Sequence, residues 1–263
     1  MNREVKMNNN LVFQEERLGK IMDMLEKEGR ILTKNLISIL NTTSVTIRKD
    51  LALLEQRGLL RRTHGGAIIT KKLYPGLALN EKEKINREEK VRIAKQAAKM
   101  ILDGDTIILD SGSTTSLLAK EIKNRNRITV ITNAMNIAIE LQNSEISVIL
   151  VGGNLLKESS TLVGPLADNM LRQVTADKLF MGVDGIDFKV GLTTPNIHEA
   201  KTSRVMMEIS GETILVVDAS KFGRRSLGVI SPLTKINTIV TTKKLSEQEL
   251  QQLNNNGIEV IIA

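Results

Sequence analysis

Apolar residues near the start of the chain recur at the spacing of an α-helix. Over residues 14–28 they lie three or four positions apart, at Leu18, Ile21, Met22 and Leu25. This spacing produces one apolar face and predicts an amphipathic helix, which Gly29 ends. A second helix is predicted over 33–40, where Thr33 can serve as the N-cap.

The pattern continues with a third helix over 44–57 and then changes to short strands. Thr43 or Ser44 can cap this helix, and Gly58 can stop it. Its buried side is predicted to hold Ile47, Leu51 and Leu54. Two strands follow, over 59–62 and 67–69, around a Gly-containing connection at 63–66. Three helices followed by such a hairpin predict a winged helix-turn-helix.

Beyond residue 100 the pattern becomes an alternation of short apolar runs and helical stretches. The runs lie at 106–109, 129–131, 148–151, 178–183, 213–217, 238–240 and 260–262. The helical stretches lie near 114–123, 134–142, 165–175, 199–210 and 246–255. This alternation predicts an α/β fold with a parallel sheet. Because the runs are apolar throughout, we expect helices on both faces of the sheet.

These patterns divide the 263 residues into domains, since one domain of this length would be large. We expect a loose tail over 1–13, a winged helix-turn-helix over 14–70, a linker over 71–90 and an α/β domain over 91–263. A charged stretch at 81–92 is expected to begin a helix that continues to Ile101.

The distribution of charge separates the same two parts. Residues 1–72 contain 14 Lys and Arg against 8 Asp and Glu, whereas the rest contains 23 against 22. Nearly all of the net charge of +7 therefore lies in the first quarter. Clustered positive charge is typical of surfaces that contact nucleic-acid phosphates, although a solvated basic face is the alternative. The first domain is therefore predicted to bind DNA.

Composition indicates the cellular compartment of the protein. The chain has no Cys, which excludes disulfides and thiolate sites and fits a reducing cytoplasm. The chain does not start with basic residues followed by an apolar run, so we expect no signal peptide. No stretch reaches the roughly 20 apolar residues of a membrane helix. We expect a cytoplasmic protein that does not associate with membranes.

Residues that follow the predicted strands carry candidate chemistry, because open parallel sheets bind ligands at the carboxyl ends of their strands. A loop of glycine and hydroxyl side chains leads into a helix after the first strand, at Asp110, Ser111, Gly112, Ser113, Thr114 and Thr115. Later strand ends and helix starts supply Thr132, Asn133, Gly152, Gly153, Asp184, Glu199 and Lys221. Each segment alone fits a cap, a turn or a surface charge. Together they predict a pocket for a small, polyhydroxylated, phosphorylated molecule.

Several motifs resemble those of the DeoR/GlpR family of bacterial transcriptional regulators. They are TIRKDLALLEQRGLLRRTHGGA (46–67), ILDSGSTT, ITNAMNIA, VGGNL, LFMGVDGID and VVDASKFG, in one register over about 14–263. The resemblance implies a winged helix-turn-helix joined to a sensor domain similar to ribose-5-phosphate isomerase. It also implies repression of a sugar operon and release by a sugar phosphate. The segments GVDGID and LTTPNIHEA are most similar to repressors of N-acetylgalactosamine and related amino-sugar operons.

The same resemblance assigns roles to residues. The recognition helix is 44–57, and the turn before it is Asn41-Thr42-Thr43 instead of the usual Gly-Val-Ser. Asn tolerates the left-handed conformation that the turn needs. The residues expected to contact DNA are Thr33, Ser44, Thr46, Arg48, Lys49, Arg61, Arg62 and His64. Ser111 to Thr115 match the phosphate loop, Thr132, Asn133, Gly152 and Gly153 the pocket walls, and Asp184, Glu199 and Lys221 the sugar-facing end.

Two other functions compete with regulation. A sugar-phosphate isomerase would use Asp184, Asp187 and Glu199 for proton transfer. The loop at 188–193 has one glycine, which departs from the glycine-rich loop of such isomerases, and a DNA-binding module is unnecessary for them. A DNA-binding scaffold without a small ligand is the third possibility. We predict the regulator, with no catalytic residues.

The predicted partners are double-stranded operator DNA and a phosphorylated sugar effector. No cofactor is expected, and no metal site, because His, Cys and Asp do not occur at ligand spacing. The protein is expected to form a homo-oligomer, a dimer or a tetramer, that places paired recognition helices in successive major grooves. In a bacterial cell it would lie in the cytoplasm with the nucleoid.

Overall fold

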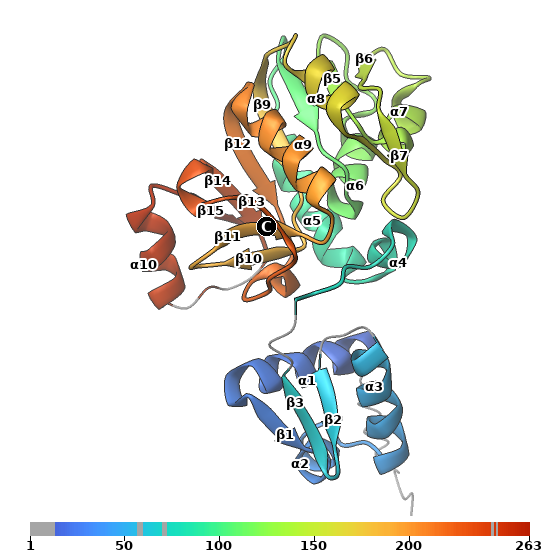
Figure 1. Cartoon of the computed structure of the whole chain (residues 1–263), viewed down its shortest axis with the longest axis vertical. Coiled ribbons are helices and arrows are strands. Elements are labelled where there is room, and N and C mark those ends of the chain that lie inside the picture. The colour runs from blue at the N-terminus through green and yellow to red at the C-terminus, as the bar shows by residue number, and fades with distance from the viewer. Residues whose placement is uncertain (1–13, 57–59, 70–72, 243–244, 246) are drawn as a thin grey trace, which may run out of the picture. The chain divides into compact units, whose positions relative to one another are not determined.

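The computed structural model describes residues 14–56, 60–69, 73–242, 245 and 247–263 (Figure 1). The chain divides into two compact units, residues 1–72 and 73–263. The predicted tail over 1–13, the stop at Gly58 and the strand residue Leu59 lie outside the described residues. No helix of the described part is long and apolar enough to cross a membrane.

The smaller unit is a winged helix-turn-helix, as predicted. Its elements are α1 (Gln14–Glu28), β1 (Arg30–Leu32), α2 (Thr33–Ile39), α3 (Ser44–Gln56), β2 (Leu60–Thr63) and β3 (Gly66–Ile69). The strands form an antiparallel sheet in the order β1-β3-β2. Strand β1 was not predicted, because three residues are too few to show a pattern of alternation. The predicted apolar positions Ile21, Leu25, Ile47 and Leu54 are buried in one core.

Local hydrogen bonds decide the caps of α2 and α3. The prediction that Thr33 caps α2 is wrong, because Leu32 occupies the N-cap position and Thr33 is the first helical residue. The Thr33 N–H instead donates to the carbonyl of Gly65 at 2.8 Å. Thr43 caps α3, since its hydroxyl accepts a hydrogen bond from the Thr46 N–H at 3.2 Å. Asn41 has φ +46°, the left-handed conformation expected of the turn.

The larger unit is built on a seven-stranded parallel sheet, which confirms the predicted fold. The strands lie in the order β15 (Glu259–Ile262), β14 (Thr238–Thr241), β12 (Ser210–Val216), β9 (Ala176–Met181), β4 (Thr106–Leu109), β5 (Thr129–Thr132) and β6 (Ser147–Leu150). All six strand pairings are parallel. From β4 the chain builds outward to β6, then returns to β9 and builds in the other direction. The direction reverses between β4 and β9, where such sheets bind ligands.

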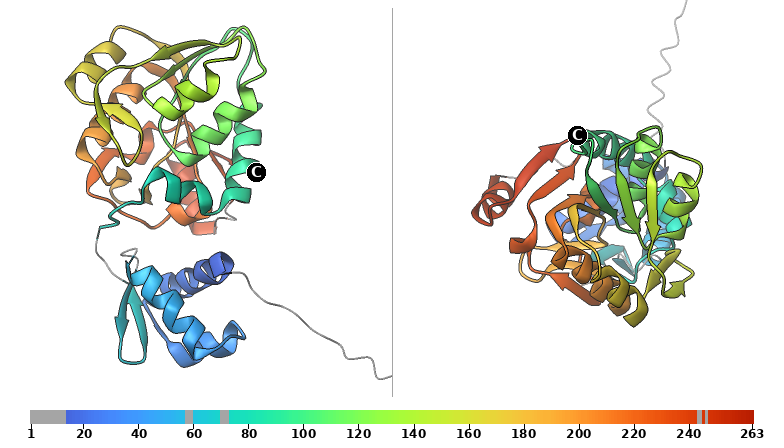
Figure 2. Two further views of the ribbon diagram at one scale, coloured as in Figure 1. Left: turned by 90° about the vertical axis from the view of Figure 1, so that its right-hand side faces the viewer. Right: turned by 90° about the horizontal axis from the view of Figure 1, so that it is seen from above.

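Helices cover both faces of this sheet (Figure 2). Alternate residues of each strand point to opposite faces, so Ile107 and Leu109 pack in one core and Ile108 in the other. One core includes residues of α5 (Arg87–Ala98), α6 (Ser113–Ile122) and α7 (Met135–Leu141). The other includes residues of α8 (Pro165–Leu171), α9 (Ile197–Glu208) and α10 (Glu247–Asn255).

Two small antiparallel additions were not predicted. One is the hairpin of β7 (Asn154–Leu156) and β8 (Thr161–Val163). The other is a sheet of β10 (Gly185–Asp187), β11 (Gly191–Thr194) and β13 (Gly228–Ser231). Their strands have only three or four residues, too few to show a pattern of alternation, and β11 also pairs with β13, which lies more distant in sequence. Both additions lie next to the end of the sheet that carries the predicted site.

The structure contradicts the predicted linker over 71–90 from residue 73 onward. These residues belong to the larger unit and form α4 (Leu79–Lys84) and the start of α5. The single helix expected from 81 to 101 is therefore wrong as well, since Asn86 takes φ +51° and separates α4 from α5. The buried Lys90 ammonium stabilises the break by donating hydrogen bonds to the carbonyls of Lys82 and Ile85.

Candidate functional site

A pocket lies at the carboxyl ends of β4, β9 and β12. Its floor and walls come from the loop between β4 and α6, the loop after β9, the start of α9, and helix α4. The lining residues are Leu79, Lys82, Asp110, Ser111, Gly112, Ser113, Thr114, Ser159, Gly182, Val183, Asp184, Thr194, Glu199, Ser203, Val216, Val217, Lys221 and Ile230. Eight of the thirteen predicted effector-binding residues are among them, so the fold brings most of the prediction to one place.

The start of α6 can bind an anion. Ser111, Gly112, Ser113 and Thr114 line the pocket there, and the first N–H groups of a helix have no partner within it. The positive end of the helix dipole lies at the same place. Thr115 differs from the four residues before it, because its side chain is fully buried and donates to the Gly112 carbonyl at 3.0 Å. Thr115 therefore supports the loop from behind.

Asp184 joins the two lysines of the pocket. The Lys82 ammonium lies 2.7 Å from Asp184 Oδ1 and 2.9 Å from Oδ2, and Lys221 lies 3.8 Å from Oδ1. Burial alone would raise the pKa of Asp184, but the two ammonium groups outweigh it and hold the pKa below its usual value. Burial lowers the pKa of Lys221, against the opposing effects of Asp184 and Asp218. The pocket thus contains a buried, nearly balanced set of charges.

Asp110 has a different environment. Burial raises its pKa to about 7, against a hydrogen bond of 2.7 Å from the Ser111 N–H, and the charge of Glu199 raises it further. Glu199 accepts a hydrogen bond from the Thr194 hydroxyl at 3.1 Å. Near neutral pH Asp110 is therefore present in both its neutral and its ionised form, so it can donate a hydrogen bond as well as accept one. Asp184 and Glu199 add further carboxyl oxygens to the pocket.

Five of the predicted effector-binding residues do not line the pocket. Thr115 is one. Thr132 is buried and donates to the Leu109 carbonyl at 2.7 Å, and Asn133 donates from its side chain to the Leu162 carbonyl at 3.1 Å. Gly153 passes so close to β8 that a Cβ would lie 2.7 Å from the Val163 carbonyl oxygen. Gly152 precedes it at the end of β6, with its N–H 3.5 Å from Met170 Sδ. The structure places these residues in the framework of the sheet end.

Four polar lining residues were not predicted: Lys82, Ser159, Thr194 and Ser203. Lys82 was placed in the linker, and its charged surroundings give no sign of a partner 102 positions away. Thr194 and Ser159 belong to the antiparallel additions that the pattern missed. Within the described residues, no three His, Cys, Asp or Glu side chains are placed to share a metal ion.

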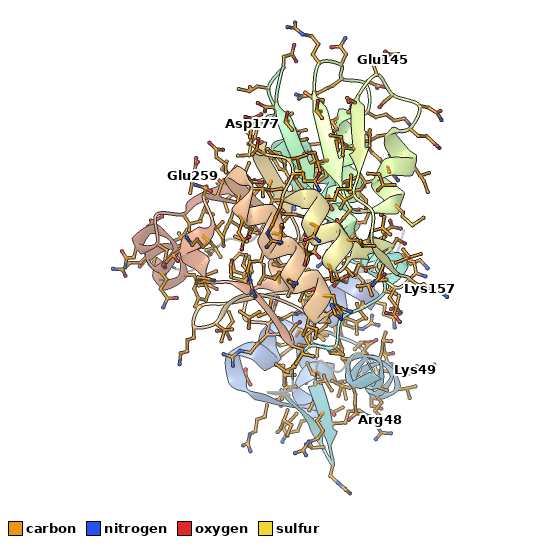
Figure 3. All side chains as sticks on the ribbon, turned by 45° about the horizontal axis from the view of Figure 1, so that its top comes forward. Arg48, Lys49, Glu145, Lys157, Asp177 and Glu259 are labelled. Atoms are coloured by element: carbon orange, nitrogen blue, oxygen red, sulfur yellow. The ribbon has the colours of Figure 1, made fainter. Side chains whose placement is uncertain are left out.

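Helix α3 of the smaller unit presents a polar face to solvent. Ser44, Arg48 and Lys49 are exposed, and Thr46 is half-buried beside Thr43. Arg48 and Lys49 project outward from the helix (Figure 3). The acidic residue next to them does not neutralise this face, because Asp50 is buried and bound by Arg17 of α1 at 2.5 Å.

The hairpin of β2 and β3 adds three exposed basic residues. Arg61, Arg62 and His64 lie on β2 and in the turn. The Arg62 guanidinium is engaged by Glu55 of α3 at 2.6 Å, and the Arg62 N–H donates to the same carboxylate at 2.8 Å. Thr33 lies beside this turn through its hydrogen bond to Gly65. All eight predicted DNA-binding residues therefore belong to the smaller unit, and Arg62 has an internal partner.

Family models match both units. Residues 17–73 match the DeoR-like helix-turn-helix domain, and residues 85–243 match the DeoR C-terminal sensor domain. The first match covers the unit that carries α3 and the hairpin. The second contains most of the pocket and leaves α4 outside.

Similar proteins extend over nearly the whole chain. The HTH-type transcriptional regulator GolR of Listeria innocua is 36% identical over 96% of this chain and 100% of its own length. The putative aga operon transcriptional repressor of Escherichia coli O157:H7 is 34% identical over 94% of this chain and 93% of its own length. Among solved structures, ribose 5-phosphate isomerase A of Methanocaldococcus jannaschii is 22% identical, with a TM-score of 0.40 over 52% of this chain and 55% of that one.

Proposed function

Because this chain belongs to the DeoR family of DNA-binding transcriptional regulators, we propose that its pocket binds a phosphorylated sugar that controls operator binding by α3 and the hairpin. One observation supports the pocket above all others. A helix N-terminus with free N–H groups, two lysines and three carboxyl groups converge at the end of the sheet where the strand order reverses.

Each end of the ligand has suitable partners. The phosphate is held by the N–H groups of residues 112–114 and by the hydroxyls of Ser111, Ser113 and Thr114, with Lys221 as a cation. Sugar hydroxyls are bound by Asp184, Glu199 and Asp110. Thr115, Thr132, Asn133, Gly152 and Gly153 hold these groups in position without touching the ligand. The similarity to a repressor named for the aga operon favours an amino-sugar phosphate.

The DNA contacts come from the smaller unit. Helix α3 enters the major groove, where Arg48 and Lys49 contact base edges and phosphates with Ser44 and Thr46 beside them. On the hairpin side, Arg61 and His64 contact phosphates, with Thr33 at the start of α2. Arg62 joins them on exchanging Glu55 for a phosphate. A dimer or tetramer presents two such units to a repeated operator.

The ligand acts as an inducer. It binds better to the form of the protein that does not fit the operator, so operator affinity falls as the ligand binds. A protein with this role works where the chromosome is, in the bacterial cytoplasm.

The position of Asp187 argues against the isomerase alternative. Its carboxylate accepts hydrogen bonds from the N–H groups of Lys189 and Val190 at 2.8 and 2.9 Å, and pairs with Arg225 at 3.0 Å. Asp187 is not a lining residue of the pocket. The pair of aspartates that proton transfer would need is therefore not assembled, in accord with relatives that are named as regulators.

A ligand screen tests the proposal. Thermal unfolding is measured with hexose 6-phosphates, pentose 5-phosphates, D-galactosamine 6-phosphate and inorganic phosphate, since a ligand of the native state raises the apparent stability. Operator fragments are selected in vitro from random DNA. A sugar phosphate that stabilises the protein is expected to release the selected fragment.

The variant Lys221→Met is expected to weaken binding of that sugar phosphate about 100-fold, because it removes a buried cation from a charge-assisted contact. Operator affinity without ligand should remain that of the wild type. Lys235→Met removes an exposed lysine of the same unit and serves as the matched control. A wild-type protein that no sugar phosphate stabilises or releases from DNA would refute the proposed function.

A further inference from the structure

Helix α4 has six residues, Leu79 to Lys84, and none of them is buried. A helix this short has little stability of its own, and most helices compensate by burying an apolar face. Because α4 lacks such a face, polar contacts hold it in place. Elements with few buried contacts are also the ones that move at small cost in free energy.

Four hydrogen bonds anchor α4 and the residues at its ends. The Leu79 N–H donates to the Glu158 carbonyl at 2.8 Å, in the loop between β7 and β8. The Lys90 ammonium donates to two carbonyls at the opposite end. Just beyond that end, the Asn86 side chain donates to Asp218 Oδ1 at 3.0 Å. These hydrogen bonds hold the backbone of α4 beside the pocket and leave the Lys82 ammonium uninvolved.

A further contact of α4 lies in the pocket itself. Lys82 reaches Asp184 at 2.7 Å, and both side chains line the cavity. Asp184 also has Lys221 at 3.8 Å, so it keeps a cation when Lys82 leaves. Of the two residues of α4 that line the pocket, Lys82 is the charged one. Its partner in this structure is Asp184, which is proposed to bind sugar hydroxyls.

The chain before α4 leads directly to the DNA-binding unit. The Tyr74 N–H donates to the Arg225 carbonyl at 2.7 Å, and the Arg224 guanidinium stacks 5.0 Å from the centre of the Tyr74 ring. The boundary between the units falls just before Leu73, six residues ahead of α4. A displacement of α4 would reach the smaller unit through this segment, which is attached to the larger unit at Tyr74.

We propose that Lys82 senses the effector: the ligand phosphate takes the Lys82 ammonium from Asp184, and α4 shifts with it. The proposal rests on the proposed function, since it assumes a sugar phosphate in this pocket. A dianion beside the start of α6 attracts Lys82 more strongly than a carboxylate that Lys221 already neutralises in part. Exchange also frees the oxygens of Asp184 for sugar hydroxyls, so no charge is left buried without a partner.

The direction of the effect follows from this exchange. The Lys82–Asp184 pair holds α4 in the arrangement that binds the operator, and the ligand breaks the pair. Removing the Lys82 charge should therefore imitate the ligand. This expectation differs from that for Lys221→Met, which should lose the ligand and keep the operator.

The experiment compares Lys82→Met with two other full-length variants. Lys82→Arg keeps a cation that can pair with Asp184. Lys84→Met removes an exposed lysine from the same helix and is the matched control. Operator affinity is measured by fluorescence anisotropy with and without D-galactosamine 6-phosphate, or the sugar phosphate that stabilises the wild type most. Hydrogen exchange of the amides of 73–86 is followed in parallel.

Without ligand, Lys82→Met is expected to bind the operator about 10-fold more weakly than the wild type, within the usual range of coupling between sites. Adding the sugar phosphate should change that affinity less than about 2-fold, and amides of 73–86 should exchange faster than in the wild type. Lys82→Arg and Lys84→Met should respond as the wild type does.

A Lys82→Met protein that binds the operator and releases it on ligand as the wild type does would overturn the proposal. So would unchanged hydrogen exchange over 73–86. In both cases the wild type still responds to the sugar phosphate, and the proposed function stands. Failure of the proposed function would give a different result, because the wild type itself would then not release the operator on adding any sugar phosphate.

Discussion

The two units of this protein hold the cations of their candidate binding sites in different ways. The smaller unit exposes Arg48, Lys49 and Arg61 to solvent, on elements whose apolar side forms the core. The larger unit buries Lys90 and largely buries Lys221, each close to a carboxylate or carbonyl group. Burial lowers the pKa of Lys90 to about 8, whereas exposed lysines keep their charge at little cost.

This difference matches the two anions that the units are proposed to bind. DNA is a long polyanion, and solvated cations attract it over distance by releasing its counterions. A single sugar phosphate must be distinguished from other small anions, so its site desolvates cations in advance and orders them with carboxylates. The first kind of surface gives affinity that depends on salt, and the second gives selectivity.

The largest expected effect is the loss of operator affinity when the exposed cations of α3 are removed. Arg48→Ala combined with Lys49→Ala should weaken operator binding by roughly 100-fold or more, since contacts to base edges and phosphates are lost together. Binding of the sugar phosphate should be unchanged, because the pocket lies wholly in residues 79–230. Anisotropy with operator DNA and calorimetry with ligand measure the two. Equal loss of both would contradict the division of labour between the units.

The next largest effect is a dependence of the free energy of unfolding on pH, caused by burial of the Asp110 carboxyl group. The pKa of Asp110 is about 7 in the folded protein and 3.8 in the reference state, so the folded chain holds one more proton between these values. The free energy of unfolding therefore falls as pH rises from 4 to 7, by on the order of 2 to 4 kcal/mol for this group. Asp110→Asn cannot titrate and should be more stable than the wild type at pH 8, with the advantage shrinking towards pH 4.

Urea unfolding at a series of pH values measures this difference. Asp103→Asn, at an exposed aspartate of the same unit, is the control and should show no such trend. A constant difference between Asp110→Asn and the wild type over pH 4 to 8 would mean that Asp110 is ionised throughout.

The smallest effect separates two neighbouring arginines of the hairpin. Arg61→Ala should weaken DNA binding about 5-fold and reduce the dependence on salt by about one phosphate contact. Arg62→Ala should cost less, about 2-fold, because Glu55 already engages that guanidinium. Titrations at several salt concentrations give both quantities. If Glu55→Gln leaves DNA affinity unchanged, the ion pair does not restrain Arg62.

The helices and parallel strands were predictable because their patterns are local. The spacing of Leu18, Ile21 and Leu25 follows from one helix packing on one core. The N-cap of α2 was not predictable from the local pattern. Thr33 is a residue type that often caps helices, but the pairing of β1 with β3 makes Leu32 the N-cap residue. The charged stretch over 81–92 predicts the start of one helix that continues to Ile101, although Asn86 breaks it and Lys90 binds the carbonyls at the break.

The sequence by itself determined the two-part organisation, the exposed basic face of α3 and the hydroxyl-rich loop before α6, since each depends on residues close together in the chain. It also placed the site at the strand ends, because parallel strands end at one edge. Only the tertiary structure decided which residues face the pocket. Lys82 and Asp184 lie 102 positions apart. Thr132, predicted to follow its strand, is the last residue of β5, and its hydroxyl donates to the Leu109 carbonyl of the neighbouring strand. Burial and long-range pairing set these outcomes, and neither depends on local sequence.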